Sequence, residues 1–159
     1  GYVDHPADRG GPTKYGITQA SLAAWRNAPA GAADVAALTR PQAAAIFRAL
    51  YFEMPGLSRL PEAVQPFMLD CSVHHGPRAA IRLLQRVLNA EGHVCARDGI
   101  VGRETAQACA AAYAALGDQL IDRLIEARLA VLERIVRRDP SQAVFSAGWR
   151  RRVESLRPG

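Results

Sequence analysis

Hydrophobic residues in the second half of the chain recur at the three- and four-residue spacing of amphipathic helices. The clearest pattern predicts a helix over residues 77–90, with Pro77 in its first turn and Gly92 just beyond its end. The positions on its apolar side are Ala80, Ile81, Leu84, Val87 and Leu88. Comparable patterns predict helices over residues 63–74, 103–115 and 117–138, with a short final helix after residue 140.

Start signals place shorter helices in the first half of the chain. Thr18 can cap a helix that runs to about residue 27, and a brief helical turn is expected over residues 34–38. Thr39 and Pro41 mark the start of another helix, because threonine caps well and proline is favoured in the first turn. That helix is expected to run to about residue 52. Its core-facing positions are predicted to be Ala44, Phe47, Leu50 and Tyr51.

Together these elements predict a mainly α protein. No run of Val, Ile, Thr and Tyr suggests a strand, and aromatic residues make up only 6% of the chain. Residues 1–18 are rich in Gly, Pro and Asp, so we expect a turn or short hairpin that faces solvent or a ligand. The helix over residues 63–74 is expected to be central. Its enclosed side chains are predicted to be Phe67, Leu69, Cys71 and Val73.

Composition narrows the classes of partner. The 159 residues suit one domain or two small joined ones, and the net charge of +5, almost entirely from arginine, suits a polyanionic partner. We do not expect that partner to be nucleic acid, because the arginines are scattered over many helices without a basic recognition helix. No apolar stretch is long enough to cross a membrane and no signal peptide is visible, so stable membrane insertion is not expected.

The cysteines do not suggest a disulfide framework or a zinc site. Cys71, Cys95 and Cys109 are odd in number and lack close spacing. We expect Cys71 and Cys109 to be buried thiols, with a bridge between Cys95 and Cys109 as the alternative.

The N-terminal turn holds the candidate catalytic residues. Asp8 is a candidate for catalysis, although an Asp in such a turn often only closes it, and Asp4 is its rival. The hydroxyl of Thr13 could hold an attacking water or make an ordinary turn hydrogen bond. Tyr2 and Tyr15 could stack on a ligand or anchor the turn to the core.

A second candidate site lies on the helix over residues 63–74. Asp70 and His74 are four residues apart and share a helix face, so they could line a cleft and bind substrate, or form a structural pair at the helix end. His74 and His75 have no further ligand at a suitable spacing except Asp70, so no metal site is predicted. Residues 98–102 are predicted to form a turn before a helix rather than a calcium loop.

Residues 1–18 resemble the start of glycoside hydrolase family 108, a family of muramidases. The family signature reads Glu-Gly-Gly-Tyr, then a short Asp-x-x-Asp stretch, Gly-Gly, and Thr-x-Tyr-Gly-Ile. The chain matches it from Gly1 through Asp4, Asp8 and Gly10 to the run that begins at Thr13. The family's catalytic Glu falls two residues ahead of Gly1. We therefore expect an N-terminal helix ending in that Glu to precede residue 1, with a naturally inactive relative as the alternative.

The second half resembles the predicted peptidoglycan-binding domain that follows the catalytic part in this family. The matching elements begin at Asp70, continue through Ala80 and Asp98, and end with the stretch from Pro140 to Val153. The two resemblances together cover nearly the whole chain. They imply a lysozyme-like catalytic part over residues 1–66 and a helical peptidoglycan-binding bundle over residues 67–159, packed against the first.

The resemblance also implies an activity. The protein is expected to be a phage- or prophage-type muramidase that cuts between N-acetylmuramic acid and N-acetylglucosamine without a cofactor or metal, with a non-catalytic peptidoglycan-binding module as the alternative. Asp8 and Thr13 would be catalytic, and Tyr2, Tyr15, Asp70 and His74 would bind the glycan strand. We expect a monomer that acts in the periplasm or cell wall, exported or released through a holin-type lesion.

The resemblance predicts that the 159-residue chain alone is nearly inactive, because no carboxylate within it matches the position of the general acid. Loss of a general acid typically lowers the rate by about 10²–10⁴-fold. The measurement is clearance of outer-membrane-permeabilised Gram-negative cells, comparing this chain with a form that carries the preceding residues. Equal clearance by the two forms would contradict the prediction.

Overall fold

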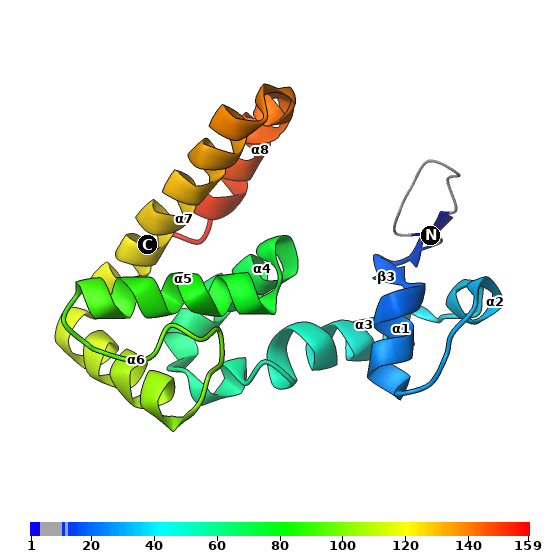
Figure 1. Cartoon of the computed structure of the whole chain (residues 1–159), viewed down its shortest axis with the longest axis horizontal. Helices are drawn as coiled ribbons and strands as arrows, with labels where there is room; N and C mark the ends of the chain where they lie inside the picture. Colours follow the sequence, from blue (N-terminus) through cyan, green and yellow to red (C-terminus); the bar gives the residue numbers. More distant parts are fainter. Residues whose placement is uncertain (4–10, 12) are drawn as a thin grey trace. The chain divides into compact units, whose positions relative to one another are not determined.

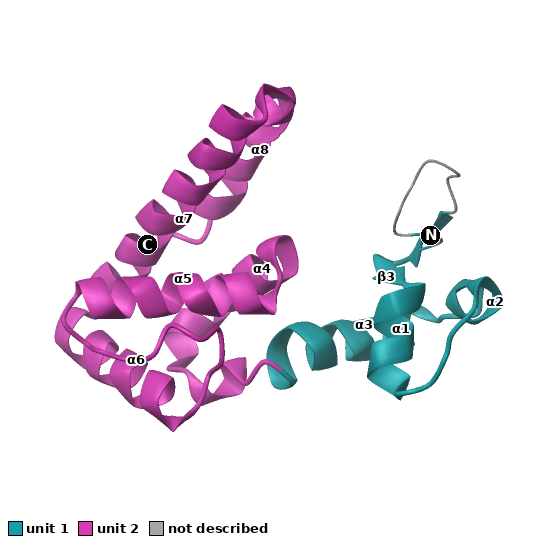
Figure 2. Cartoon of the chain, in the orientation of Figure 1, with its two compact units in different colours: residues 1–54 teal, residues 55–159 magenta. Residues whose placement is uncertain are grey.

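The computed structural model describes residues 1–3, 11 and 13–159. Within these residues the protein has eight α-helices, a few short 3₁₀ and π turns, and three two-residue strands, so the predicted mainly α fold is confirmed (Figure 1). The chain forms two compact units, residues 1–54 and residues 55–159 (Figure 2).

A small antiparallel sheet opens the first unit. Strand β1 (Tyr2–Val3) pairs with β2 (Thr13–Lys14), and β2 pairs with β3 (Ile17–Thr18). The turn between β2 and β3 has positive φ at both Tyr15 (54°) and Gly16 (80°), as in the mirror-image turns that suit a two-residue hairpin. A Cβ atom on Gly16 would also lie 3.3 Å from the ring of Phe47, so backbone and packing both favour glycine there.

Side-chain caps determine where the helices of the first unit begin. Helix α1 (Gln19–Arg26) begins as predicted, because the hydroxyl of Thr18 accepts the backbone N–H of Ser21 at 3.0 Å. Helix α2 (Ala32–Ala36) begins two residues before the predicted start at Asp34. The reason is that Asp34 caps from within the first turn, where its carboxylate accepts the N–H of Gly31 at 2.8 Å.

The predicted cap at Thr39 is confirmed. Helix α3 (Arg40–Arg48) begins with a capping box, in which Thr39 and Gln42 each bind the backbone N–H of the other. The helix continues as a π turn, η1 (Ala49–Glu53), so helical backbone runs one residue beyond the predicted end.

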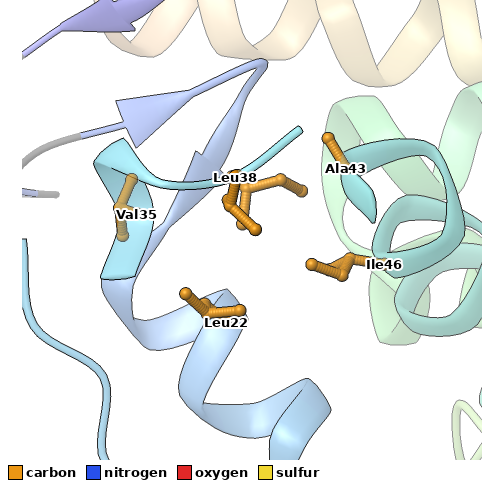
Figure 3. Packing of buried hydrophobic residues seen from close by; sticks show 6 residues of the cluster. Leu22, Val35, Leu38, Ala43 and Ile46 are labelled. Atoms are coloured by element: carbon orange, nitrogen blue, oxygen red, sulfur yellow. The ribbon is translucent and has the colours of Figure 1, made fainter. Parts of the chain in front are cut away.

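The core of the first unit gathers apolar side chains from the sheet and all three helices (Figure 3). Its buried members are Ile17, Leu22, Val35, Leu38, Ala43 and Ile46. The predicted face of α3 was wrong at Ala44, which is exposed, although Phe47 and Leu50 pack partly against the core. In this alanine-rich helix neighbouring stripes are equally apolar, so the periodicity could not choose between Ala43 and Ala44.

All the regular elements of the second unit are helical. Two 3₁₀ turns, η2 (Leu57–Arg59) and η3 (Glu62–Val64), lead into α4 (Gln65–His75), which Gly76 separates from α5 (Pro77–Ala90). Helices α6 (Arg103–Leu116) and α7 (Asp118–Arg138) follow, and a 3₁₀ turn, η4 (Pro140–Gln142), leads into α8 (Ala143–Glu154). Helix α5 packs against α4, α6 and α7, and α8 runs back along α7.

The apolar face predicted for α5 is confirmed, because all five of its members are buried. On α4 the prediction was partly wrong: Phe67 and Cys71 are buried, but Leu69 is 36% exposed. Met68 and Ser72 are buried instead. Residues 67, 69, 71 and 73 alternate with the period of a strand, and a helix cannot turn all four toward one side.

A polar contact fixes the turn before α6. The side chain of buried Gln85 donates to Asp98, to the carbonyl of Ile100 and to Thr105, each at 3.0 Å. Its carbonyl oxygen accepts the N–H of Gly99 at 2.9 Å. These bonds explain why residues 98–102 form the predicted turn ahead of a helix.

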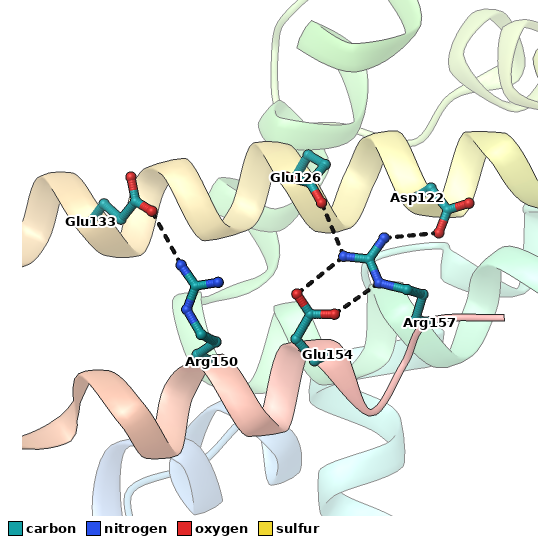
Figure 4. Close-up of polar contacts among 6 residues, drawn as sticks. All are labelled: Asp122, Glu126, Glu133, Arg150, Glu154 and Arg157. Atoms are coloured by element: carbon teal, nitrogen blue, oxygen red, sulfur yellow. Dashed lines mark hydrogen bonds and ion pairs between the residues drawn. The ribbon is translucent and has the colours of Figure 1, made fainter. Parts of the chain in front are cut away.

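Ion pairs line the seam between α7 and α8 (Figure 4). Arg157 binds Asp122, Glu126 and Glu154 at 3.1, 2.9 and 2.8 Å, and Arg150 binds Glu133 at 3.3 Å. Hydrogen bonding from Arg157 holds the pKa of Glu154 below its usual value. Each pair is partly exposed and contributes little stability, but together they specify the register of the two helices. Among the described residues, no helix combines the length and apolar character that a membrane span requires.

Replacing Leu84 by alanine should lower the free energy of unfolding by about 2–5 kcal/mol, because the side chain is completely buried on α5. The same change at Leu69, which is 36% exposed on α4, is the matched control and should cost well under about 2 kcal/mol. Chemical denaturation followed by circular dichroism measures both. Equal losses in the two variants would show that the core of this unit is not centred on α5.

Candidate functional site

The sheet of the first unit pairs Val3 and Thr13, the residues on either side of the sequence segment that holds Asp4 and Asp8. Val3 in β1 is the register partner of Thr13 in β2. Asp4 and Asp8 lie between these strands in the sequence and fall outside the described residues. The two ends of the segment are therefore neighbours across one antiparallel pair, which separates their Cα atoms by only about 5 Å.

Thr13 sits on the central strand of this sheet. Its backbone is the register partner of Val3 on one side and Thr18 on the other. The side chain is partly buried and makes no hydrogen bond with another described residue. The sheet therefore fixes the backbone of Thr13 and leaves its hydroxyl without a described structural partner.

The two predicted sugar-stacking tyrosines have different surroundings. Tyr2 is 42% exposed on the edge strand β1. Tyr15 packs against the core of the first unit, and its ring lies 5.5 Å from the ammonium of Lys14 and 5.8 Å from the guanidinium of Arg40. Lys14 also donates to the carbonyl of Ala36 at 2.8 Å. The ring of Tyr15 is thus held by its own unit, whereas Tyr2 is exposed on the edge strand.

Asp70 and His74 meet a buried arginine in the second unit. The guanidinium of Arg128, on α7, is completely buried and lies 2.8 Å from a carboxylate oxygen of Asp70. It also lies 3.0 Å from Nδ1 of His74 and donates through Nε to Nε2 of His75 at 3.2 Å. Arg152, on α8, binds the same Asp70 carboxylate at 2.9 Å. These five residues form what we call the Arg128 cluster.

Aromatic rings border this cluster. The guanidinium carbon of Arg128 lies 5.7 Å from the ring of Phe67. His74 stacks on His75 with 4.3 Å between ring centroids, and lies 5.7 Å from the ring of Trp149 on α8. Interactions on three sides therefore hold the predicted pair of Asp70 and His74 in place.

Burial and the neighbouring arginines determine the charge of the imidazoles. Burial, followed by the proximity of His74 and of the arginines, lowers the pKa of His75 to about 4. Burial and then Arg128 also lower the pKa of His74. Both rings are therefore neutral at pH 7 and can accept hydrogen bonds from Arg128. Because the imidazoles are neutral, the charged groups of the cluster are the guanidinium groups of Arg128 and Arg152 and the one carboxylate of Asp70.

Sequence reasoning found Asp70 and His74 but missed Arg128. Leu124, Ile125 and Leu132 form the apolar stripe of α7 and are all buried. Arg128 falls on the same stripe. A charged residue at a core position requires a partner, so the sequence signals a buried polar contact at Arg128 without identifying the partner.

The structure also describes the predicted thiols. Cys71, Cys95 and Cys109 are all buried and free, which confirms the expectation for Cys71 and Cys109. Burial raises the pKa of Cys71 to about 11 and that of Cys109 to about 12, so both stay protonated at pH 7. Among the residues described, no group of three or more His, Cys, Asp and Glu side chains is placed to hold a metal ion.

Comparison with known proteins defines the class. The family model Glycosyl hydrolase 108 matches residues 1–76, and the model Predicted Peptidoglycan domain matches residues 79–154. The solved structure of Brucella abortus SagA is 38% identical in sequence. The match covers 99% of this chain and 83% of that one, with a TM-score of 0.76. The curated proteins contain no match.

These matches identify a peptidoglycan-acting hydrolase. The chain belongs to the glycosyl hydrolase 108 family and carries that family match ahead of a peptidoglycan domain. Helix α4 falls inside the hydrolase match, yet it packs within the second compact unit. The division of the chain at residue 66 stays a prediction.

The lowered pKa of His75 predicts that the protein becomes less stable in mild acid. Between pH 6.5, the ordinary value, and about pH 4, the unfolded chain binds a proton that the folded chain excludes. The free energy of unfolding should therefore fall as the pH falls through this window. Urea denaturation at pH 7 and at pH 4.5 measures the loss.

In the variant His75→Gln this loss should be smaller, because glutamine can accept the hydrogen bond from Arg128 and does not titrate. His93→Gln, outside the cluster, is the matched control and should keep the loss seen in the unchanged chain. An identical pH dependence for His75→Gln and the unchanged chain would contradict the assignment.

Proposed function

We propose that this hydrolase is a muramidase, which cleaves the glycosidic bond between N-acetylmuramic acid and N-acetylglucosamine. The observation that carries the proposal is the order of the two matches, glycosyl hydrolase 108 over residues 1–76 and a peptidoglycan domain over residues 79–154. Peptidoglycan glycan strands are a natural substrate for a glycoside hydrolase joined to such a domain.

Hydrolysis of a glycosidic bond uses two carboxyl groups on opposite sides of that bond. We assign the second of these to Asp8, which lies between β1 and β2 in the sequence. Its charge would face the developing oxocarbenium ion or activate water. The first carboxyl group, the general acid, would be supplied by the Glu of the family signature, whose place in that signature is two residues ahead of the one that Gly1 matches. Thr13, whose backbone is fixed on the central strand β2, would hold the attacking water.

The surroundings of the four expected substrate-binding residues support that role to different degrees. Tyr2 has an exposed ring on the edge strand, which suits stacking against a sugar. Tyr15 is packed against the core of the first unit, so it would hold the β2–β3 turn in place and present one edge of its ring to the glycan. Asp70 and His74 are bound to Arg128 and would orient the surface around them more than grip the glycan.

The oligomeric state, origin and cellular location are also proposed from the resemblance to this family. We propose a monomeric enzyme of phage or prophage origin that acts on the cell wall from the periplasm, reaching it by export or through a holin-type lesion, without a cofactor. The second candidate is a peptidoglycan-binding module that no longer cuts. The separate domain match over residues 79–154 favours it.

Asp8→Asn should lower hydrolysis by roughly 10²-fold or more in a protein that carries the family's Glu-Gly ahead of Gly1, since the amide cannot supply the charge. The measurement is clearance of permeabilised Gram-negative cells, together with mass spectrometry of the released fragments. A muramidase leaves N-acetylmuramic acid at the new reducing end. Circular dichroism checks that the variant is folded.

Asp4→Asn is the matched control, because it makes the same chemical change in the same segment, and it should keep most of the activity. Full activity in Asp8→Asn with loss in Asp4→Asn would reassign the carboxylate. Binding to purified wall sacculi without any release of fragments would support the second candidate.

A further inference from the structure

A pocket of about 540 Å³ opens in the second unit between α4, α5 and α7. Its apolar wall includes Cys71 on α4, Leu83 on α5 and Val131 on α7. His75 and the α4–α5 turn at Pro77 also line it. The volume falls within the range of about 300–1,000 Å³ that is usual for small-ligand sites.

Three arginines line the pocket beside this apolar wall. Arg78, Arg82 and Arg86 all line the pocket and repeat every four residues along α5, so they lie on one side of the helix. All three are exposed, and no carboxylate of a described residue lies within ion-pair distance of them. Arg78 packs against the turn at Gly99. The hydrogen bond from Gln85 is the main cause of the lowered pKa of the Asp98 carboxyl, and the charge of Arg78 adds to it. The side chain of Arg82 packs against the same turn.

The other groups in the pocket supply no opposing charge. Burial keeps the Cys71 thiol protonated by raising its pKa to about 11, and the His75 imidazole is neutral at pH 7 because its pKa is lowered to about 4. Elsewhere in the second unit, Arg123, Arg150 and Arg157 each bind a carboxylate. The pocket therefore combines an apolar wall with the positive charges of Arg82 and Arg86, which no described carboxylate pairs with, and it suits an anionic ligand with aliphatic groups.

Within peptidoglycan, one component has that chemistry. The sugars of the glycan strand carry no free charge once the lactyl group is joined to the peptide, whereas the peptide stems carry free carboxylates and short aliphatic side chains. Successive arginines on α5 are separated by roughly 6 Å along the helix axis. Two residues of an extended peptide span roughly 7 Å, so neighbouring carboxylates of a stem can reach neighbouring arginines.

We propose that this pocket binds the acidic peptide stem of peptidoglycan, with its carboxylates on Arg82 and Arg86 and its aliphatic groups against Leu83 and Val131. The proposal rests on peptidoglycan being the partner, but it does not require that the protein cut the glycan. It gives the second unit a role distinct from that of the N-terminal segment, namely recognition of the peptide rather than of the sugar.

The test is a titration of the ¹⁵N-labelled 159-residue chain with the tripeptide L-Ala–γ-D-Glu–meso-diaminopimelate, followed by NMR. Amide signals of Gly76 and of residues 78–86 should shift, and the affinity should fall as salt is added. Arg82→Ala/Arg86→Ala should weaken binding on the order of tenfold or more, because two charge-assisted contacts are lost. Arg82→Lys/Arg86→Lys should retain part of the affinity, since the charge remains.

Two controls make the result specific. Arg103→Ala removes an exposed arginine that makes no ion pair among the described residues and does not line the pocket, and it should leave binding unchanged. The tripeptide with its carboxylates esterified should not bind. Equal binding of the esterified peptide, or an unchanged affinity in Arg82→Ala/Arg86→Ala, would overturn the proposal.

A further titration distinguishes a site for the peptide from a basic surface that binds any anion. A short single-stranded oligonucleotide should bind more weakly than the tripeptide, and without shifts at Leu83 and Val131. An oligonucleotide that bound as well as the tripeptide and shifted the same residues would also overturn the proposal. Failure of the wall-clearance assay would count against the proposed muramidase activity alone, because tripeptide binding is measured without any bond being cut.

Discussion

The ion pair between Arg128 and Asp70 is the interaction on which the second unit depends. A completely buried guanidinium loses its hydration, which costs several kcal/mol unless other groups replace the water. Here one carboxylate, two neutral imidazoles and the ring of Phe67 supply most of that replacement. One nitrogen of Arg128, Nη1, has no hydrogen-bond partner among the described residues, so the compensation is incomplete. Removing Asp70 would leave an uncompensated buried charge.

The same cluster joins the three helices that surround it. Asp70 and the two histidines come from α4, Arg128 from α7, and Arg152 from α8. The seam of ion pairs along α7 and α8 lies at the surface, where each pair contributes little, so the buried pair is the more demanding constraint. Because a carboxylate and a guanidinium tolerate little displacement, the cluster specifies how α4 approaches α7 more tightly than apolar packing could.

Helix α4 connects the Arg128 cluster to the arginine-lined pocket. His75 accepts a hydrogen bond from Arg128 and also lines the arginine-rimmed pocket, and the neighbouring Cys71 lines the same pocket. A rigid helix on one side of a pocket lowers the entropy cost of binding a ligand there. The residues that sequence reasoning proposed as a cleft pair, Asp70 and His74, therefore also hold the wall of a different site.

The sequence by itself determined where most helices begin and end, because caps, prolines and glycines act locally: Thr18, Thr39 and Pro77 each open a helix as predicted. It also determined the buried face of α5, where a single apolar stripe allows one orientation. Tertiary structure decided the faces of α3 and α4, where several stripes are similarly apolar and only packing selects Ala43 or Met68. It also decided the partner of Asp70, because Arg128 lies 58 residues further along the chain and local spacing carries no information about so distant a contact.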